Sequence, residues 1–137
     1  MNADKSSKIL VIKSDISELG TVEDMVHEIF KSNEIPDKYF NKVFLCLSEA
    51  IVNSIQHGNC NDKNKEVTIF AYCNSQMINI KIKDEGKGFD FYKVADPTLK
   101  ENIKKESGRG IHIIRSLADS ISYDKTEKSI QFKIECK

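Results

Sequence analysis

The chain has 137 residues, 39% of them hydrophobic and 31% charged, a composition typical of one globular domain with its own hydrophobic core. Its 21 basic and 21 acidic residues cancel, so we expect no broad basic surface for nucleic acid. The sequence has no long apolar run, no apolar leader and no C-x-x-C pair, which argues against a membrane span, a secretory signal and a zinc site. We therefore expect a single domain over residues 1–137 that works in the cytoplasm.

The first part of the chain predicts one strand followed by two helices. The short apolar run at residues 9–12 predicts a strand. Apolar residues then recur at helical spacing over residues 18–31, and again from Pro36 to about His57. Pro36 suits a helix entry because the N–H group that proline lacks has no partner in a first turn.

Beyond the polar loop at residues 60–65, the apolar period changes from that of a helix to that of a strand. Four segments alternate apolar and polar residues: 67–72, 78–82, 121–123 and 130–136. Residues 74–76 suit a hairpin turn between the first two of these strands. Between the second and third, helical spacing returns over residues 111–118, and we expect Gly110 to open that helix.

The alternating strands have one apolar and one polar face, and such a sheet is packed on one side only. The helices must then cover that side. We predict an α/β fold of the α+β type, a two-layer sandwich in which a mixed, mostly antiparallel sheet is covered on one face by three helices. Residues 89–107 have no clear period and lie between two glycine turns, so they suit a lid over a ligand or an ordinary surface loop.

Glu49, Asn53 and His57 lie four residues apart, so a helix places them along one face. Magnesium takes hard oxygen ligands, and an Asn side-chain oxygen can bind it while nucleotide phosphates complete the shell. A carboxylate one turn earlier can accept a proton from an attacking hydroxyl. A solvated pair on a surface helix would also explain Glu49 and Asn53, and His57 suits helix-end capping as well as ligand contact.

Asp84 follows the second alternating strand and begins a glycine turn. Its carboxylate can accept a hydrogen bond from an exocyclic amine such as that of adenine. Gly86 and Gly88 let a ligand approach the backbone closely. An ordinary Asp-Gly turn after a strand is the alternative.

A second glycine turn, Gly108-Arg109-Gly110, precedes the predicted third helix and is followed by Ile111. Free backbone N–H groups at a helix start favour phosphate, helped by the helix dipole. The turn does not match the P-loop pattern G-x-x-x-x-G-K-[ST], and an ordinary helix entry would also explain it. Arg109 contacts either phosphate or solvent.

Taken together and in this order, the three motifs resemble the N, G1 and G2 boxes of the GHKL ATPase superfamily. They are Glu-x-x-x-Asn-x-x-x-His-Gly-Asn at residues 49–59, Asp-Glu-Gly-Lys-Gly at 84–88 and Ser-Gly-Arg-Gly at 107–110. Within the superfamily the short chain is similar to the bacterial anti-sigma factor serine/threonine kinases, and the resemblance runs from about residue 9 to 134. It implies a Bergerat ATP-binding fold with residues 89–107 as the ATP lid.

The resemblance also implies roles for the motif residues. By it, Glu49 is the general base, Asn53 is the magnesium ligand and Asp84 contacts the adenine amine. Ser129 lies where the family often has a Thr near adenine. The complete set of candidate nucleotide contacts is Asn53, His57, Asp84, Gly86, Gly88, Gly108, Arg109, Gly110, Ile111 and Ser129.

The implied function uses ATP and Mg²⁺ to phosphorylate a Ser or Thr of an anti-sigma antagonist protein. The same protein would sequester a sigma factor or similar transcription regulator, form a homodimer and contact neither nucleic acid nor membrane. Two alternatives keep the nucleotide site: a non-catalytic module whose partner affinity is gated by nucleotide, and a free-standing ATPase domain of the two-component type. A structural α/β protein with accidental motifs would need three ordered coincidences.

Overall fold

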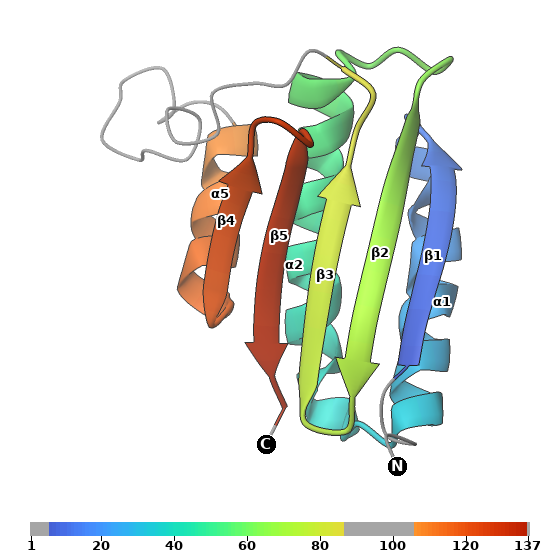
Figure 1. Cartoon of the computed structure of the whole chain (residues 1–137), viewed down its shortest axis with the longest axis vertical. Coiled ribbons are helices and arrows are strands. Elements are labelled where there is room, and N and C mark those ends of the chain that lie inside the picture. Colours follow the sequence, from blue (N-terminus) through green and yellow to red (C-terminus); the bar gives the residue numbers. More distant parts are fainter. Residues whose placement is uncertain (1–5, 87–105, 137) are drawn as a thin grey trace.

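The computed structural model describes residues 6–86 and 106–136, with side chains for residues 7–86 and 111–136 (Figure 1). The strands are β1 (Ser6–Lys13), β2 (Glu66–Asn74), β3 (Met77–Lys83), β4 (Ser120–Asp124) and β5 (Ser129–Glu135). The helices are α1 (Leu19–Asn33), α2 (Phe40–Asn53) and α5 (Glu106–Leu117). Short helical turns precede α1 (η1, Ile16–Glu18) and α2 (η2, Asp37–Tyr39), and a π-helical turn follows α2 (η3, Ser54–Gly58).

The five strands form one sheet in the order β1-β2-β3-β5-β4, and the helices lie together behind it (Figure 1). This arrangement confirms the predicted two-layer sandwich. All four pairings between the described strands are antiparallel, so the parallel pair that a mixed sheet would contain is not among them. Antiparallel pairing follows from the short turn that joins β2 to β3, because such a turn reverses the chain within a few residues.

The core lies between the helices and the inner face of the sheet. Every second residue of β2 and β3 is buried, as the two-residue period predicted. The largest completely buried side chains are Leu47, Ile51, Ile55, Ile69, Ile78, Ile80, Ile82, Ile111, Ile114, Ile130 and Phe132. Burying each such side chain stabilises the fold by roughly 1.5–3 kcal/mol relative to exposing it. Cys46 and Cys73 are also buried and belong to this core.

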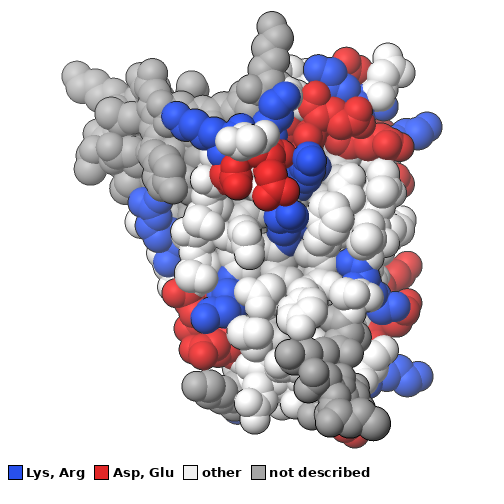
Figure 2. Space-filling model, in the orientation of Figure 1, with Lys and Arg blue, Asp and Glu red and all other residues white. Residues whose placement is uncertain are grey.

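Among the described residues, no helix lies over the outer face of the sheet (Figure 1). Figure 2 shows that charged side chains gather near the end of this face where β3 ends and β5 begins, whereas its middle is mostly uncharged. Toward the β1 edge, Ile9 and Val11 are 67% and 48% exposed. β1 is the outermost strand on its side, and within the described residues no further strand pairs with it.

Two helix boundaries differ from the sequence prediction. The second helix, expected to run unbroken to about His57, stops being α-helical at Asn53 and continues as the π-helical turn. The third begins at Glu106, four residues before the expected start at Gly110. Glycine costs a helix only about 1 kcal/mol relative to alanine, so a glycine pair lowers helix propensity without excluding a helix. None of the helices in the described parts of the chain is long and apolar enough to cross a bilayer.

Candidate active site

Asn53, the last residue of α2, is completely buried. Its Nδ2 donates a hydrogen bond to the backbone carbonyl of Glu49 at 2.8 Å, whereas its Oδ1 has no hydrogen-bond partner. Leaving a buried acceptor unpaired costs about 1–3 kcal/mol, so such an atom calls for an explanation such as a bound ion. Within the described residues, the hydroxyl of Ser54 is the only other buried side-chain polar atom without a hydrogen-bond partner. This burial excludes a solvated surface position for Asn53.

Glu49 lies one turn before Asn53 on α2 and is half-buried. The spacing of four residues therefore does place the carboxylate and the amide on one stretch of helix, as predicted. His57 belongs to the π-helical turn that follows α2, whose residues advance by a smaller angle than those of an α-helix. His57 is half-buried at this turn. Short π-helical segments occur frequently at functional sites.

Asp84 follows β3 directly and is 3% exposed. Its Oδ1 accepts a hydrogen bond from the backbone N–H of Gly86 at 2.8 Å. Burial raises the pKa of the Asp84 carboxyl above its ordinary value, and the bond from Gly86 together with the charges of Lys128 and Lys65 offsets this only in part. A buried carboxylate with a shifted pKa indicates a functional site more strongly than the solvated acid of an ordinary turn does. The Asp84 carboxylate therefore suits a polar group of a ligand.

The Asp84 turn packs directly on the π-helical turn. A Cβ atom added to Gly58 would overlap the carboxylate of Asp84, and one added to Gly86 would overlap the carbonyl oxygen of Gly58. Both positions therefore need glycine because another chain segment occupies the space of a side chain. Gly58 belongs to the first motif and Gly86 to the second, so this contact joins the two motifs.

Ser129, at the start of β5, lies beside the Asp84 turn. Its Cα pairs with that of Lys83, and the N–H of Asp84 donates to the carbonyl of Lys128 at 3.3 Å. Ser129 is 2% exposed. The register of β3 and β5 thus brings together two candidate adenine contacts that are far apart in sequence.

The third motif is described in part. Gly108, Arg109 and Gly110 lie within the first turns of α5, and Ile111 is completely buried in the core. α5 packs against α2, and its N-terminal end lies at the same end of the sheet as the π-helical turn (Figure 1). Most of the predicted lid, residues 89–107, lies outside the described residues, because the structure does not describe residues 87–105. Gly88 lies outside them as well.

Three site residues were not singled out from the sequence: Ser14, Asn59 and Glu85. Asn59 is completely buried, and its Oδ1 accepts a hydrogen bond from the N–H of Glu85 at 2.8 Å. Its Nδ2 donates to the hydroxyl of Ser14 at 2.7 Å. The sequence signals were the place of Asn59 at the end of the first motif and that of Glu85 within the second, whereas Ser14 lies outside all three motifs.

The described residues contain no cluster of three or more His, Cys, Asp or Glu side chains that could hold a metal ion. A divalent cation here would therefore depend on few protein ligands and on the oxygens of a bound substrate. Mg²⁺ is commonly bound in that way, through one or two side chains and substrate phosphates. The unpaired Oδ1 of Asn53 is a hard oxygen of the kind that such a site needs.

The fold and the order of the motifs define a histidine kinase-like ATPase domain. The model of that family matches residues 12–134, and the chain belongs to it. This membership confirms the resemblance to GHKL ATPases.

Among curated proteins, the chain is similar to anti-sigma factors and to a serine-protein kinase. It is 33% identical to the anti-sigma F factor of Clostridium beijerinckii over 100 residues, which are 71% of this chain and 68% of the relative. The anti-sigma F factor of Thermoanaerobacter sp. (strain X514) is 33% identical over 82 residues, 58% of this chain and 57% of the relative. The serine-protein kinase RsbW of Bacillus subtilis is 31% identical over 83 residues, 56% of this chain and 52% of the relative. The chain thus spans little more than half the length of the last two.

A solved structure of the RsbU and RsbW domains of a Mycobacterium tuberculosis protein has the same fold. Its TM-score is 0.63, and the match covers 95% of this chain and 32% of that one. The sequence identity is 11%, so this likeness concerns the fold alone.

Proposed function

We propose that this protein binds ATP with Mg²⁺ and transfers the terminal phosphoryl group to a Ser or Thr of an anti-sigma antagonist protein. We propose further that it sequesters a sigma factor or similar regulator. The observation that carries the proposal is the buried, unpaired Oδ1 of Asn53, one turn from Glu49, in a histidine kinase-like ATPase domain. Relatives named anti-sigma F factor and serine-protein kinase support the choice of reaction and partners.

In the proposed mechanism, Asn53 is the protein ligand of the cation through Oδ1. When bound, Mg²⁺ neutralises charge on the phosphates. Glu49 accepts the proton of the attacking Ser or Thr hydroxyl, the role in which a positioned carboxylate accelerates phosphoryl transfer. The free backbone N–H groups in the first turn of α5, which includes Gly108, favour the phosphates, and Gly110 lies just beyond that turn.

At the other end of the nucleotide, Asp84 accepts a hydrogen bond from the adenine amine. Its Oδ1 already accepts one bond from Gly86, which fixes the carboxylate for a further donor. Gly86 lets the base approach the backbone, and Ser129 lies nearby on β5. His57, Gly88, Arg109 and Ile111 complete the proposed set, Ile111 through its backbone because its side chain belongs to the core.

We propose that the protein acts as a single domain with residues 89–107 as a lid, that it forms a homodimer, and that it works in the cytoplasm, where sigma factors act. Sedimentation at several protein concentrations tests the dimer. A sedimentation coefficient of the monomer at all concentrations, with and without MgATP, would remove the homodimer from the proposal.

The kinase proposal is tested with labelled ATP, Mg²⁺ and candidate antagonist proteins from the same genome. We expect label on a Ser or Thr of one antagonist with the wild type, and none with Asn53→Ala. ATP binding without transfer to any antagonist would favour the nucleotide-gated module instead. Label on a His of the partner would favour an ATPase domain of the two-component type.

A further inference from the structure

A buried cluster of polar groups lies directly behind the two glycine contacts. The Asn59 cluster consists of the side chains of Asn59 and Ser14 with the backbone groups of Lys65, Glu66 and Glu85 that they bind. Nδ2 of Asn59 donates to the Ser14 hydroxyl at 2.7 Å and to the Glu66 carbonyl at 3.0 Å. The Ser14 hydroxyl donates in turn to the Lys65 carbonyl at 2.8 Å. Asn59 is completely buried and Ser14 is 2% exposed.

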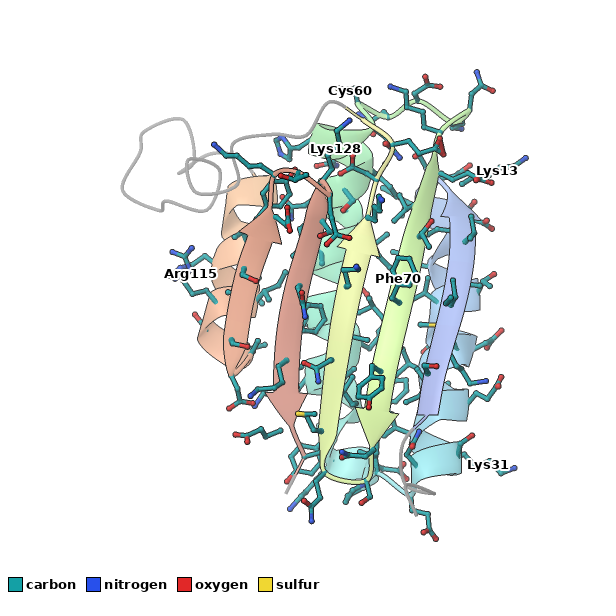
Figure 3. All side chains as sticks on the ribbon, in the orientation of Figure 1. Lys13, Lys31, Cys60, Phe70, Arg115 and Lys128 are labelled. Carbon is teal, nitrogen blue, oxygen red and sulfur yellow. The ribbon has the colours of Figure 1, made fainter. Side chains whose placement is uncertain are left out.

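The cluster joins four segments that are distant in sequence. Ser14 follows β1, Glu66 begins β2, Glu85 follows β3, and Asn59 follows the π-helical turn. The N–H of Asn59 also donates to the carbonyl of Ser54 at 2.8 Å, which closes that turn. In Figure 3, Cys60 and Lys13, the chain neighbours of Asn59 and Ser14, lie at the same end of the sheet.

The chemistry of the cluster requires an amide. Oδ1 of Asn59 accepts from the N–H of Glu85 at 2.8 Å, while Nδ2 donates to two other partners. Aspartate would keep the acceptor but lose both donors, and alanine would lose all three bonds. Buried polar groups left without partners are costly, so replacing Asn59 is expected to move the groups that it binds.

We propose that Asn59 is a positioning residue for nucleotide binding, which fixes the Asp84 turn relative to Asn53. The side-chain oxygen of Asn59 accepts the bond from the N–H of Glu85, the neighbour of Asp84. The backbone N–H of Asn59 closes the turn that follows Asn53. Asn59 thereby sets the distance between the group proposed for the adenine amine and the group proposed for the cation. This inference rests on the proposed ATP site and adds a residue whose side chain touches neither base nor phosphate.

Asn59→Ala is the primary test, and Asn33→Ala is its matched control. Asn33 is also buried, at 7% exposure, and its Nδ2 donates to the Ile29 carbonyl at 2.9 Å. It is the last residue of α1, near Lys31 at the opposite end of the sheet from the Asn59 cluster (Figure 3). Both variants remove a buried amide, so both should lower the urea midpoint of unfolding, but only Asn59→Ala should disturb the nucleotide site.

The measurement is calorimetric titration of each folded variant with MgATP and with MgGTP. We expect the dissociation constant for MgATP to rise about tenfold in Asn59→Ala, the ratio that corresponds to about 1.4 kcal/mol. The preference for ATP over GTP should also fall, because guanine has a carbonyl where adenine has the amine that Asp84 would bind. A purely structural role would lower the folded fraction without changing that preference. In Asn33→Ala we expect both quantities to stay at the wild-type value.

Ser14→Ala keeps the inference testable if Asn59→Ala does not fold. It removes one partner of Asn59 and leaves the bond to Glu66, so we expect a smaller rise of the MgATP dissociation constant in the same direction. Wild-type affinity and ATP preference in either folded cluster variant would overturn the positioning role. Failure of the wild type itself to bind MgATP would overturn the proposed function and this inference with it, so the two failures are distinct.

Discussion

Asn53 and Asn59 are both completely buried, six residues apart, but their side-chain amides are in opposite states. Both polar atoms of the Asn59 side chain are paired, and they hold four chain segments together. Asn53 has a partner for its nitrogen and none for its oxygen. The difference teaches that burial alone does not mark a ligand group. A buried amide with every atom paired belongs to the scaffold, whereas one with an unpaired oxygen has capacity for a ligand.

The largest expected effect sharpens the Asn53 side of this comparison. Glu49→Gln should lower phosphoryl transfer by about 10²–10⁴-fold, the usual contribution of a general base. The amide keeps the backbone carbonyl that binds Asn53 and loses only the ability to take a proton. The measurement is single-turnover transfer of label from ATP to the antagonist, with the MgATP dissociation constant as the control. Undiminished transfer would remove Glu49 from the role of base.

The next effect tests the packing on the Asn59 side. Gly86→Ala should destabilise the protein by about 3 kcal/mol, because its Cβ would overlap the backbone of Gly58 and force the two turns apart. Gly20→Ala is the matched control. It has no atom within 4 Å of its added Cβ and lies within α1, so it should stabilise the protein by about 0.5–1 kcal/mol. Urea unfolding of both variants measures the difference, and equal stability would contradict the contact.

Asn53→Ala addresses the comparison directly. Wild-type protein with MgATP at 100 times its dissociation constant should gain about 2.7 kcal/mol of unfolding free energy, and Asn53→Ala should lose most of that gain. Without nucleotide, Asn53→Ala should lose less stability than Asn59→Ala, because it breaks one side-chain bond and removes an unpaired oxygen. Thermal unfolding with and without MgATP measures both. If nucleotide-free Asn53→Ala lost more stability than nucleotide-free Asn59→Ala, the contrast between the two amides would be wrong.

The smallest effect concerns pH. Burial raises the pKa of Asp84 above its ordinary value of 3.8, so the folded state binds this proton more tightly than the unfolded state does. Unfolding free energy therefore falls as pH rises from the unfolded to the folded pKa, and the full cost persists at higher pH. Asp84→Asn removes this cost and should be more stable than wild type at neutral pH, with the advantage vanishing below about pH 3.8. Urea unfolding across this pH range checks the sign.

The sequence predicted the architecture because periodicity reports directly on burial. The alternation in β2 and β3 and the helical spacing around Leu47 and Ile51 each placed one face of an element in the core, and the structure buries those faces. The motif spacing also identified Asn53 and Asp84, whose burial at one end of the sheet agrees with a shared site.

The remaining features depend on contacts between distant segments. The partners of Asn59 include Ser14 and Glu85, which lie 45 and 26 residues away, and no local pattern encodes such pairings. The change from α-helix to π-helical turn after Asn53 was missed because both forms accept the same residues, and the packing of Gly58 on Asp84 accompanies the change. The early start of α5 reflects the same limit, since two glycines weaken a helix without determining where it begins.

β1 is the outermost of the described strands on its side of the sheet, and this has a consequence for handling the purified protein. An edge strand with exposed Ile9 and Val11 offers unpaired backbone groups beside apolar side chains, a combination that favours strand-to-strand association. Net charge provides no opposing repulsion near neutrality, because the sequence isoelectric point is about 6.8. We expect precipitation to be greatest near that pH, and concentrated stocks to keep best in buffers well to either side of it.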